Sequence, residues 1–318
     1  MRVSGTGAPA PGAVVHLTRA DVERLVSPRA AMAAIAGALA AGASRHIART
    51  SVELSGGELL LMPAESRSAA GVKVLALATA PAPGAPMAAG VYVVFDAESL
   101  APVAVLDAAA LTELRTAAVS AWATDALARP DASVLVLFGT GAQARAHLRA
   151  LAAVRPLRRV LVVGRDPARV EALVELAGGL ALDASAAGPQ AVAGADLVCC
   201  CTSSADPLFD GRLLREETHV VAVGSHRPER REVDTETVVR SAVVVEDRAS
   251  ALAAGDLGVP AREGRFSPRD VAADLFELAS GLALDRSGRP TLFKSVGMGF
   301  EDLAVARAAV AEASRAPR

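Results

Sequence analysis

The residues best suited to chemistry are two glycines and an alanine that follow an apolar run. Residues 133–138 are apolar apart from Ser133 and lead into Gly139-Thr140-Gly141-Ala142-Gln143-Ala144, after which a helical stretch begins. In a G-x-G-x-x-A turn the first glycine allows the bend, the second leaves room for a pyrophosphate, and the third small residue permits close helix–strand packing. The helix N-terminus offers N–H groups to phosphate. We therefore predict dinucleotide binding; the alternative is a tight turn without a ligand.

The next apolar run ends in a pattern that bears on which dinucleotide is bound. Residues 159–163 are followed by Gly164, Arg165 and Asp166. An acidic residue at this tip usually takes the ribose 2′-hydroxyl of NAD, whereas an arginine suits the 2′-phosphate of NADP. We predict NADP(H) as the preferred cofactor and NAD(H) as the alternative. The competing interpretation is a solvated Arg165, with Asp166 capping the helix that starts at Pro167.

A lysine inside an apolar strand is a further candidate for chemistry. Lys73 lies within the apolar run 71–76. A buried ammonium is costly unless it is paired, so its position indicates a function. The alternative is a lysine at a strand edge.

The three cysteines, in contrast, predict no chemistry. Cys199, Cys200 and Cys201 are adjacent, and neighbours on a strand point to opposite faces, so they match neither a disulfide framework nor a C-x-x-C site. We predict that they are small core residues, that the chain has no metal site, and that it works in a reducing compartment.

The elements that must position these residues change in type along the chain. Residues 1–13 have no periodicity and are predicted to be a flexible arm. A helical pattern begins near Thr18, and strand-like runs follow at 51–54, 58–62, 71–76, 90–96 and 101–106. A helix followed by a run of strands predicts an α+β unit with an antiparallel or mixed sheet.

The second part of the chain alternates strands and helices. Residues 110–127 are predicted to form one long helix, and apolar runs follow at 133–138, 159–163, 196–201, 219–223 and 242–245. Such runs are typical of strands buried on both faces. With helices at 143–154 and 167–176 between them, they predict a parallel, doubly wound sheet. Residues 301–313 form a final alanine-rich helical stretch.

Composition excludes several classes of protein. The chain has 318 residues, 52% of them hydrophobic and 21% charged, with a formal net charge of −2. It is therefore neither a disordered chain nor a basic, nucleic-acid-binding one. The longest weakly polar run, at 30–43, is shorter than the roughly 20 residues of a spanning helix. No signal-peptide pattern precedes it, so we expect a cytoplasmic protein without a membrane partner.

Taken together, the motifs resemble one known family. The string Arg115-Thr116-Ala117-Ala118-Val119-Ser120 and the glycine turn at 139–144, in this order and spacing, resemble the ornithine cyclodeaminase/mu-crystallin family. The resemblance implies a central Rossmann domain (128–300) inserted into an N-terminal α+β substrate-binding and dimerisation domain (14–127), which the C-terminal helix (301–318) completes. It also implies a homodimer.

The resemblance assigns roles to particular residues. Substrate-binding positions match Arg49, Met62, Lys73 and Arg115, and the positively charged ones among them would hold a carboxylate. Catalytic candidates are Lys73 and Arg115, together with His226, since histidine is a common proton donor in catalysis. The cofactor-binding positions are Thr116, Gly139, Thr140, Gly141, Ala142, Gln143, Arg165, Thr202, Ser203, Val223, Gly224, Ser225, Lys294, Val296 and Gly297.

Two positions separate the chain from true cyclodeaminases, which carry pocket carboxylates there. This sequence has Leu60 and His226 instead. By resemblance we therefore expect an NAD(P)H-dependent reductase of small cyclic α-imino acids, such as Δ1-pyrroline-2-carboxylate or Δ1-piperideine-2-carboxylate. The alternatives are an ornithine or lysine cyclodeaminase, an amino-acid dehydrogenase, and a non-catalytic NADP-dependent binding protein.

Overall fold

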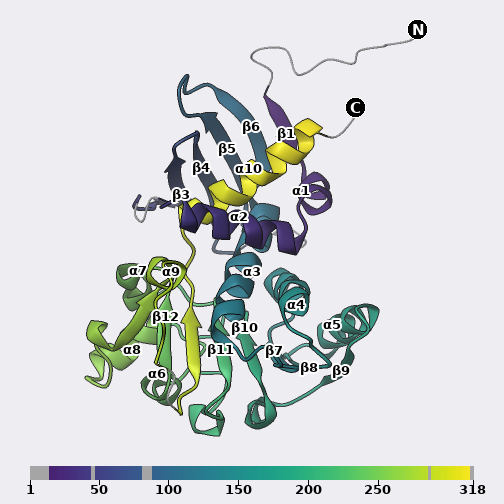
Figure 1. Ribbon diagram of the computed structural model, residues 1–318, viewed down its shortest axis with the longest axis vertical. Coiled ribbons are helices and arrows are strands. Elements are labelled where there is room, and N and C mark those ends of the chain that lie inside the picture. Colours follow the sequence, from purple (N-terminus) through teal and green to yellow (C-terminus); the bar gives the residue numbers. More distant parts are fainter. Residues whose placement is uncertain (1–13, 44–46, 81–87, 286–287, 316–318) are drawn as a thin grey trace. The chain divides into compact units, whose positions relative to one another are not determined.

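A computed structural model describes residues 14–43, 47–80, 88–285 and 288–315 (Figure 1). The chain divides into two units, Met1–Arg115 with Met298–Arg318, and Thr116–Gly297. The division falls inside helix α3 (Ala108–Leu127). The predicted domain limits, 14–127 with 301–318 and 128–300, stay predictions. The predicted arm at 1–13 lies outside the described residues.

Within its described residues, the first unit is built on a six-stranded mixed sheet in the order β1-β6-β5-β4-β3-β2. Strand β1 pairs with β6 in parallel, and the other pairs are antiparallel. The prediction of an antiparallel or mixed sheet is confirmed. The strands are β1 (Val15–Leu17), β2 (Thr50–Leu54), β3 (Gly57–Ser66), β4 (Ala69–Ala78), β5 (Ala88–Asp96) and β6 (Pro102–Asp107).

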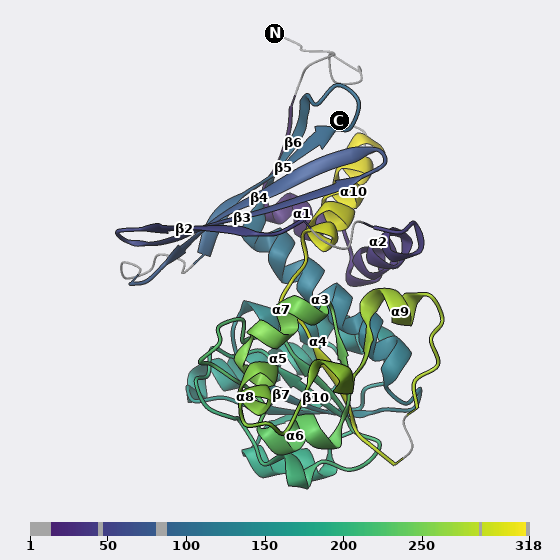
Figure 2. The same cartoon turned by 90° about the vertical axis from the view of Figure 1, so that its left-hand side faces the viewer.

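In the part of this unit that the structure describes, three helices accompany the first part of α3: α1 (Arg19–Leu25), α2 (Pro28–Ala40) and α10 (Gly299–Arg315). Helix α1 starts where Thr18 and Asp21 form a capping box, and α2 starts where Ser27 caps a helix with proline in its first turn. Helix α10 lies against β3, β4 and β5, and α2 packs on α10 (Figure 2). The C-terminal helix thus returns to cover one face of the N-terminal sheet.

The second unit is the predicted doubly wound sheet. Its described strands form one eight-stranded parallel sheet in the order β13-β12-β14-β11-β10-β7-β8-β9. The strands are β7 (Val134–Phe138), β8 (Arg159–Val163), β9 (Asp183–Ala186), β10 (Leu197–Cys200), β11 (His219–Ala222), β12 (Ala242–Val245), β13 (Val271–Asp274) and β14 (Thr291–Lys294). The order reverses beside β7, the strand that carries the glycine turn, as expected for a dinucleotide-binding fold.

Short helices connect these strands: α4 (Ala142–Val154), α5 (Pro167–Gly179), α6 (Thr235–Arg240), α7 (Arg248–Ala253), α8 (Gly255–Arg262) and α9 (Leu275–Ala279), with 3₁₀ turns η1 (Pro189–Gly194), η2 (Gly211–Leu213) and η3 (Pro268–Asp270). No helix in the described part of the chain is long and apolar enough to span a membrane.

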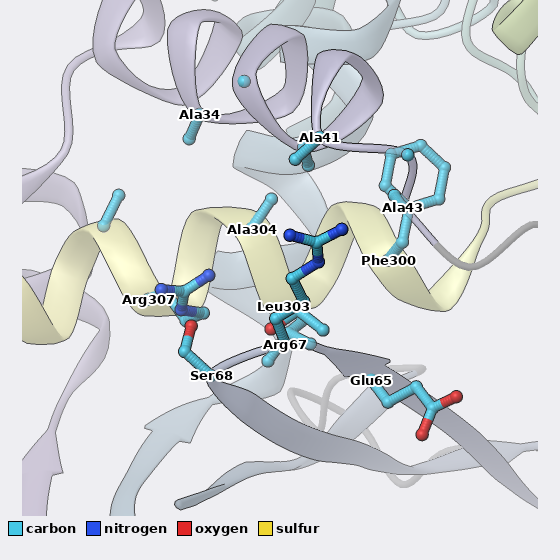
Figure 3. Close-up of a pocket in the computed structure, with 15 residues that line it drawn as sticks. Ala34, Ala41, Ala43, Glu65, Arg67, Ser68, Phe300, Leu303, Ala304 and Arg307 are labelled. Atoms are coloured by element: carbon cyan, nitrogen blue, oxygen red, sulfur yellow. The ribbon is translucent and has the colours of Figure 1, made fainter. Parts of the chain in front are cut away.

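A groove of about 790 Å³ lies between α2, α10 and the β3–β4 turn of the first unit (Figure 3). Small residues of both helices line it, and Arg67 and Arg307 add positive charge. None of the predicted site residues lines this groove. The candidate site is therefore built from residues outside this groove, and it contains the buried charged side chains.

Candidate active site

The centre of the first sheet holds Met62, Lys73 and Tyr92 in one row across β3, β4 and β5. All three are buried, with exposures of 4%, 1% and 0%. Because alternate residues of a strand face opposite sides, the apolar residues around Lys73 position its ammonium under α10. The lysine predicted from an apolar strand is thus a core residue, not an edge one.

Two carboxylates of α10 meet the predicted cations. The Lys73 ammonium donates to both Asp302 oxygens at 2.9 and 3.1 Å and to the Thr112 hydroxyl at 3.2 Å. The Arg115 guanidinium donates to Glu301 at 2.7 Å and lies 3.3 Å from Asp302. Both carboxylates are fully buried. Lys73, Arg115, Glu301 and Asp302, which we call the α10 cluster, therefore hold two positive and two negative charges.

The environment of Lys73 shifts its pKa toward neutral pH. Burial lowers the pKa of Lys73 to about 8, although the Asp302 charge opposes this shift. The positive charge of Arg115 acts in the same direction as burial. An ammonium with this pKa can release its proton near physiological pH, which is the property required of a general acid.

Tyr92 contributes a buried hydroxyl beside the cluster. Burial, together with the charge of Asp302, raises the pKa of Tyr92, so it stays a neutral phenol. Its hydroxyl has no hydrogen-bond partner among the described residues. Gly71 lies directly against the ring, where any Cβ would collide with the phenol. The glycine thus makes room for Tyr92 next to Lys73.

The sequence reasoning missed Glu301 and Asp302. The available signal was a pair of acidic residues between Phe300 and Leu303 in the first turn of a helix, which alone is ordinary dipole compensation. Their partners lie 186 and 229 residues away in the sequence. Only the fold brings these charges together.

Two of the predicted substrate-binding and catalytic residues are exposed. Arg49 precedes the fully exposed strand β2, and His226 lies in the loop after β11. Both differ from Lys73 and Arg115, which are buried. The roles predicted for Arg49 and His226 stay predictions.

In the second unit, the glycine turn has the geometry expected of a phosphate cradle. Gly139 has φ +104°, and a Cβ there would collide with the Cys201 carbonyl. At Gly141, which caps α4 without a side-chain hydrogen bond, a Cβ would meet no atom within 4 Å. Ala144 is fully buried. The backbone of α4 is therefore open to an anion, and the residues present fit a dinucleotide pyrophosphate.

The tip of β8 separates the tasks of two neighbouring residues. The Asp166 carboxylate accepts from the Ala168 and Arg169 N–H groups at 3.0 and 3.3 Å and so caps α5. Arg165 is exposed, and Gly164 packs against Thr140, leaving no space for a Cβ. Asp166 therefore caps helix α5, and Arg165 faces solvent.

The carboxyl ends of β10 and β11 are joined by a carboxylate. Glu232 accepts from the Thr202 N–H and hydroxyl at 2.6 and 2.8 Å and from the Gly224 N–H at 2.6 Å. Burial and the neighbouring Asp256 raise the pKa of Glu232 to about 7. The predicted cofactor positions at these strand ends are Thr202, Ser203, Val223, Gly224 and Ser225, and Glu232 fixes two of them.

Lys294 holds the same strand ends from β14. Its fully buried ammonium lies 2.8 Å from Asp256 and donates to the Ser225 carbonyl at 2.6 Å. Asp256 in turn accepts from the Glu232 N–H at 2.6 Å. The Lys294 side chain is therefore engaged within the protein, and a contact of this residue with the cofactor stays a prediction. We call Glu232, Asp256 and Lys294 the strand-end cluster.

Glu246 orders the segment that follows β14. One of its oxygens accepts from the Val296 and Gly297 N–H groups at 2.8 and 2.5 Å, and the residue is fully buried. Sequence reasoning missed this glutamate, which directly follows strand β12. Val296 and Gly297 are thus fixed by their backbone, whichever group they contact. Thr116, also predicted to contact the cofactor, is buried in α3.

Comparison with known proteins gives a consistent result. The family model for the ornithine cyclodeaminase/mu-crystallin family matches residues 13–316. A Delta(1)-pyrroline-2-carboxylate reductase of Bacillus cereus is 34% identical over 261 residues, covering 78% of this chain and 79% of that protein.

Solved structures extend the likeness to the whole fold. The Thermococcus litoralis Delta(1)-pyrroline-2-carboxylate reductase, in complex with NADH and L-proline, has a TM-score of 0.89 and 30% identity, covering 95% of this chain and 98% of that one. An archaeal alanine dehydrogenase dimer with bound NAD also has a TM-score of 0.89, with 29% identity over 94% of this chain and 96% of that one.

Proposed function

This chain belongs to the ornithine cyclodeaminase/mu-crystallin family, and we propose that it reduces a small cyclic α-imino acid, with Δ1-pyrroline-2-carboxylate as the first candidate. It is an NAD(P)-dependent oxidoreductase of amino-acid metabolism, as its reductase relatives are. The observation that carries the proposal is the α10 cluster. It buries a lysine with a pKa of about 8 between Asp302 and Thr112.

The second unit holds the nicotinamide cofactor in this proposal. Gly141 and the first turn of α4 bind the pyrophosphate, and the ends of β10 and β11 border the nicotinamide side. When bound, the reduced cofactor supplies a hydride to the carbon of the C=N bond. Glu232 holds Thr202 and Gly224 in place without a ligand. Binding of the cofactor therefore does not have to order these groups, which reduces the entropy lost on binding.

The first unit handles the substrate's carboxylate and its proton. Arg49, Lys73 and Arg115 are the proposed carboxylate clamp. Lys73 and Arg115 are buried and paired with Asp302 and Glu301, and Arg49 is exposed. Because a guanidinium can hold a carboxylate through two parallel hydrogen bonds, we assign the carboxylate chiefly to the two arginines, and the proton for the imine nitrogen to Lys73 rather than to His226.

We further propose a homodimer joined through the first sheet. The face of the sheet opposite α10 carries a row of half-exposed apolar residues: Pro63, Val72, Val93 and Val105, with Leu61, Val74 and Val91 beside them. An apolar patch on a sheet whose other face is covered by helices suits an isologous contact with a second copy. Val74→Asp should convert the dimer to a monomer in light scattering; a monomeric wild-type chain would contradict the proposal.

The choice of NADP(H) depends on Arg165. Its exposed guanidinium, beside Gly164 and with Asp166 occupied by helix capping, suits a 2′-phosphate. Steady-state kinetics should favour NADPH over NADH, and Arg165→Ala should reduce that preference about ten-fold. A large advantage for NADH would contradict it.

The reaction itself is tested by cofactor stoichiometry. The purified chain is mixed with NADPH and a panel of cyclic imines, including Δ1-pyrroline-2-carboxylate and Δ1-piperideine-2-carboxylate. One NADPH should be oxidised for each imine reduced. Ammonia release from ornithine with no net change in cofactor would identify a cyclodeaminase instead. Absence of turnover across the panel, with the dinucleotide bound, would indicate a binding protein.

A further inference from the structure

A cluster of soft ligand atoms lies in the second unit, on side chains that the proposed function does not use. Cys199 lies in β10 and shares a face with Cys201, which directly follows the strand, while Cys200 points to the other side. The Cys199 and Cys201 sulfurs are 3.6 Å apart. Together with one ring nitrogen of His147, these ligand atoms all lie within 4.8 Å of one another. We propose that His147, Cys199 and Cys201 form a binding site for a thiophilic metal ion of the zinc and cadmium class.

The sulfur spacing fits an ion. Two thiolates at about 2.3 Å from a tetrahedral zinc ion are about 3.8 Å apart, and the thiols here already stand at 3.6 Å. They would therefore need almost no movement. A ring nitrogen of His147 lies within 4.8 Å of both sulfurs, so a shift of about 1 Å or less would bring it to the distance expected between ligands of a tetrahedral ion. A solvent molecule would provide the fourth ligand.

The histidine is held as metal-binding histidines commonly are. Its Nδ1 lies 2.8 Å from the Gln143 carbonyl, one turn earlier in α4. A carbonyl only accepts, so Nδ1 carries the proton and Nε2 keeps its lone pair. A backbone carbonyl on the second nitrogen fixes the tautomer and orients the ring. The Ser120 hydroxyl, 3.0 Å from Nε2, would have to turn away when an ion binds.

The surroundings favour a soft ion. His147 and Cys199 are fully buried, whereas Cys201 is half-buried at the end of β10. Thiolates rather than thiols bind the ion, so binding releases protons and strengthens as the pH rises. Thiolates select soft cations over calcium or magnesium.

Cys200 supplies a matched control within the same strand. Its side chain belongs to the apolar core with Phe138 and Phe209 on the opposite side of the sheet. It has the same chemistry as its two neighbours and is one residue from each, but it cannot reach His147 in this fold. Any effect that is specific to the cluster must therefore spare Cys200→Ala.

The experiment is a titration of the reduced, metal-free full chain with Cd²⁺, followed through the ultraviolet thiolate-to-cadmium absorption band. We expect one equivalent of Cd²⁺ per chain, displaced by excess Zn²⁺. The band should persist in Cys200→Ala, disappear in Cys199→Ala and Cys201→Ala, and need at least ten-fold more Cd²⁺ in His147→Gln. No band in the wild type, or a band that survives loss of Cys199 or Cys201, would overturn the proposal.

A second measurement on the wild-type chain guards against variants that fail to fold. The chain is first loaded with Cd²⁺ and then alkylated while denaturant is added, and the cysteines labelled in the first stage of unfolding are identified by mass spectrometry. Cd²⁺ should slow the labelling of Cys199 and Cys201 relative to Cys200. Equal slowing of all three, or of none, would contradict the site. Neither experiment depends on the proposed reductase activity.

Discussion

Each unit of the molecule buries one lysine almost completely, and the two lysines are held in different ways. In the first unit, Lys73 bonds to side chains, the Asp302 carboxylate and the Thr112 hydroxyl. In the second, Lys294 bonds to Asp256 and also to the Ser225 carbonyl. A backbone carbonyl cannot change its charge or move without the strand. Lys294 therefore ties strands together, whereas Lys73 keeps partners that can exchange protons.

The two clusters also differ in charge balance. The α10 cluster matches two cations with two carboxylates. The strand-end cluster has Lys294 as the counterion for both Asp256 and Glu232, and the unbalanced charge contributes to raising the pKa of Glu232 to about 7. Burial of a lysine is thus not enough to mark a catalytic residue. The nature of its partners decides between a structural tie and a tunable acid.

The largest effect on turnover is expected from Lys73→Met. The variant removes the proposed proton donor, so kcat should fall about 10³-fold, within the range for loss of a general acid. The fold should persist because Asp302 keeps Arg115 at 3.3 Å as a counterion. Imine-dependent NADPH oxidation measures the loss, and NADPH binding by fluorescence serves as the control. A kcat within ten-fold of the wild type would contradict the role of Lys73.

The equivalent change in the other unit should act on stability instead. In Lys294→Met, Asp256 loses its ion-pair partner next to a second carboxylate. Leaving a buried charge unpaired in this way costs about 3–5 kcal/mol. Urea unfolding should show this loss, and any folded fraction should lose less turnover than Lys73→Met does. A variant as stable as the wild type would remove the distinction between the two lysines.

Asp302→Asn tests how the first cluster tunes its lysine. The Asp302 charge raises the pKa of Lys73 against the larger effect of burial, so the amide should let this pKa fall below about 8. The alkaline limb of the kcat profile, where the lysine loses its proton, should then move to lower pH. At pH 8 we expect a loss of about 10²-fold, with a smaller loss at pH 6.

Glu301→Gln is the matched control for this shift. Glu301 also raises the pKa of Lys73, but its contribution is smaller than that of Asp302. Its alkaline limb should therefore move less than that of Asp302→Asn. Profiles that coincide with the wild type in both variants would show that Lys73 does not set the limb.

Sequence alone was enough for the parts of the fold that depend on local pattern. The apolar runs predicted strands β7, β8, β10, β11 and β12, and the spacing of Gly139, Gly141 and Ala144 predicted a turn that the structure contains. The pattern did not predict β9, β13 and β14, each of which has a charged residue at one end. Length is not the reason, since β10, β11 and β12 also have only four residues, which are apolar apart from His219.

The site was predictable only on its cationic side. Lys73 was conspicuous because its neighbours in sequence are apolar. Asp302 and Glu232 have no such mark, since acidic residues in a first helical turn or a polar loop are common. Asp302 and Glu232 are recognised as site residues only by the groups that they contact. Such partners can be far away in the sequence, since Lys73 and Asp302 are 229 residues apart. Long-range pairing of charges is a property of topology, which no local window contains.

The smallest effect in this comparison is expected from Glu232→Gln. This variant should change how the free energy of unfolding depends on pH. The folded-state pKa of Glu232, about 7, lies above its ordinary value of 4.5. The folded chain therefore keeps a proton that the unfolded chain releases between these values. This stabilisation is full below pH 4.5 and is lost as the pH rises through 7. Glutamine does not titrate, so the variant should lack this decline.

The measurement is the free energy of unfolding by urea at several values between about pH 5 and 7.5. Over this range the wild type should lose about 2 kcal/mol relative to Glu232→Gln. Only the pH dependence tests the prediction, not the absolute stability of the variant. The amide has one acceptor oxygen for the three donor groups of Thr202 and Gly224, so it also loses hydrogen bonds. Glu229→Gln, at an exposed position of the same loop, controls for surface charge. A constant offset across the pH range would show that Glu232 is ionised throughout, and that the single ammonium of Lys294 is enough for both carboxylates.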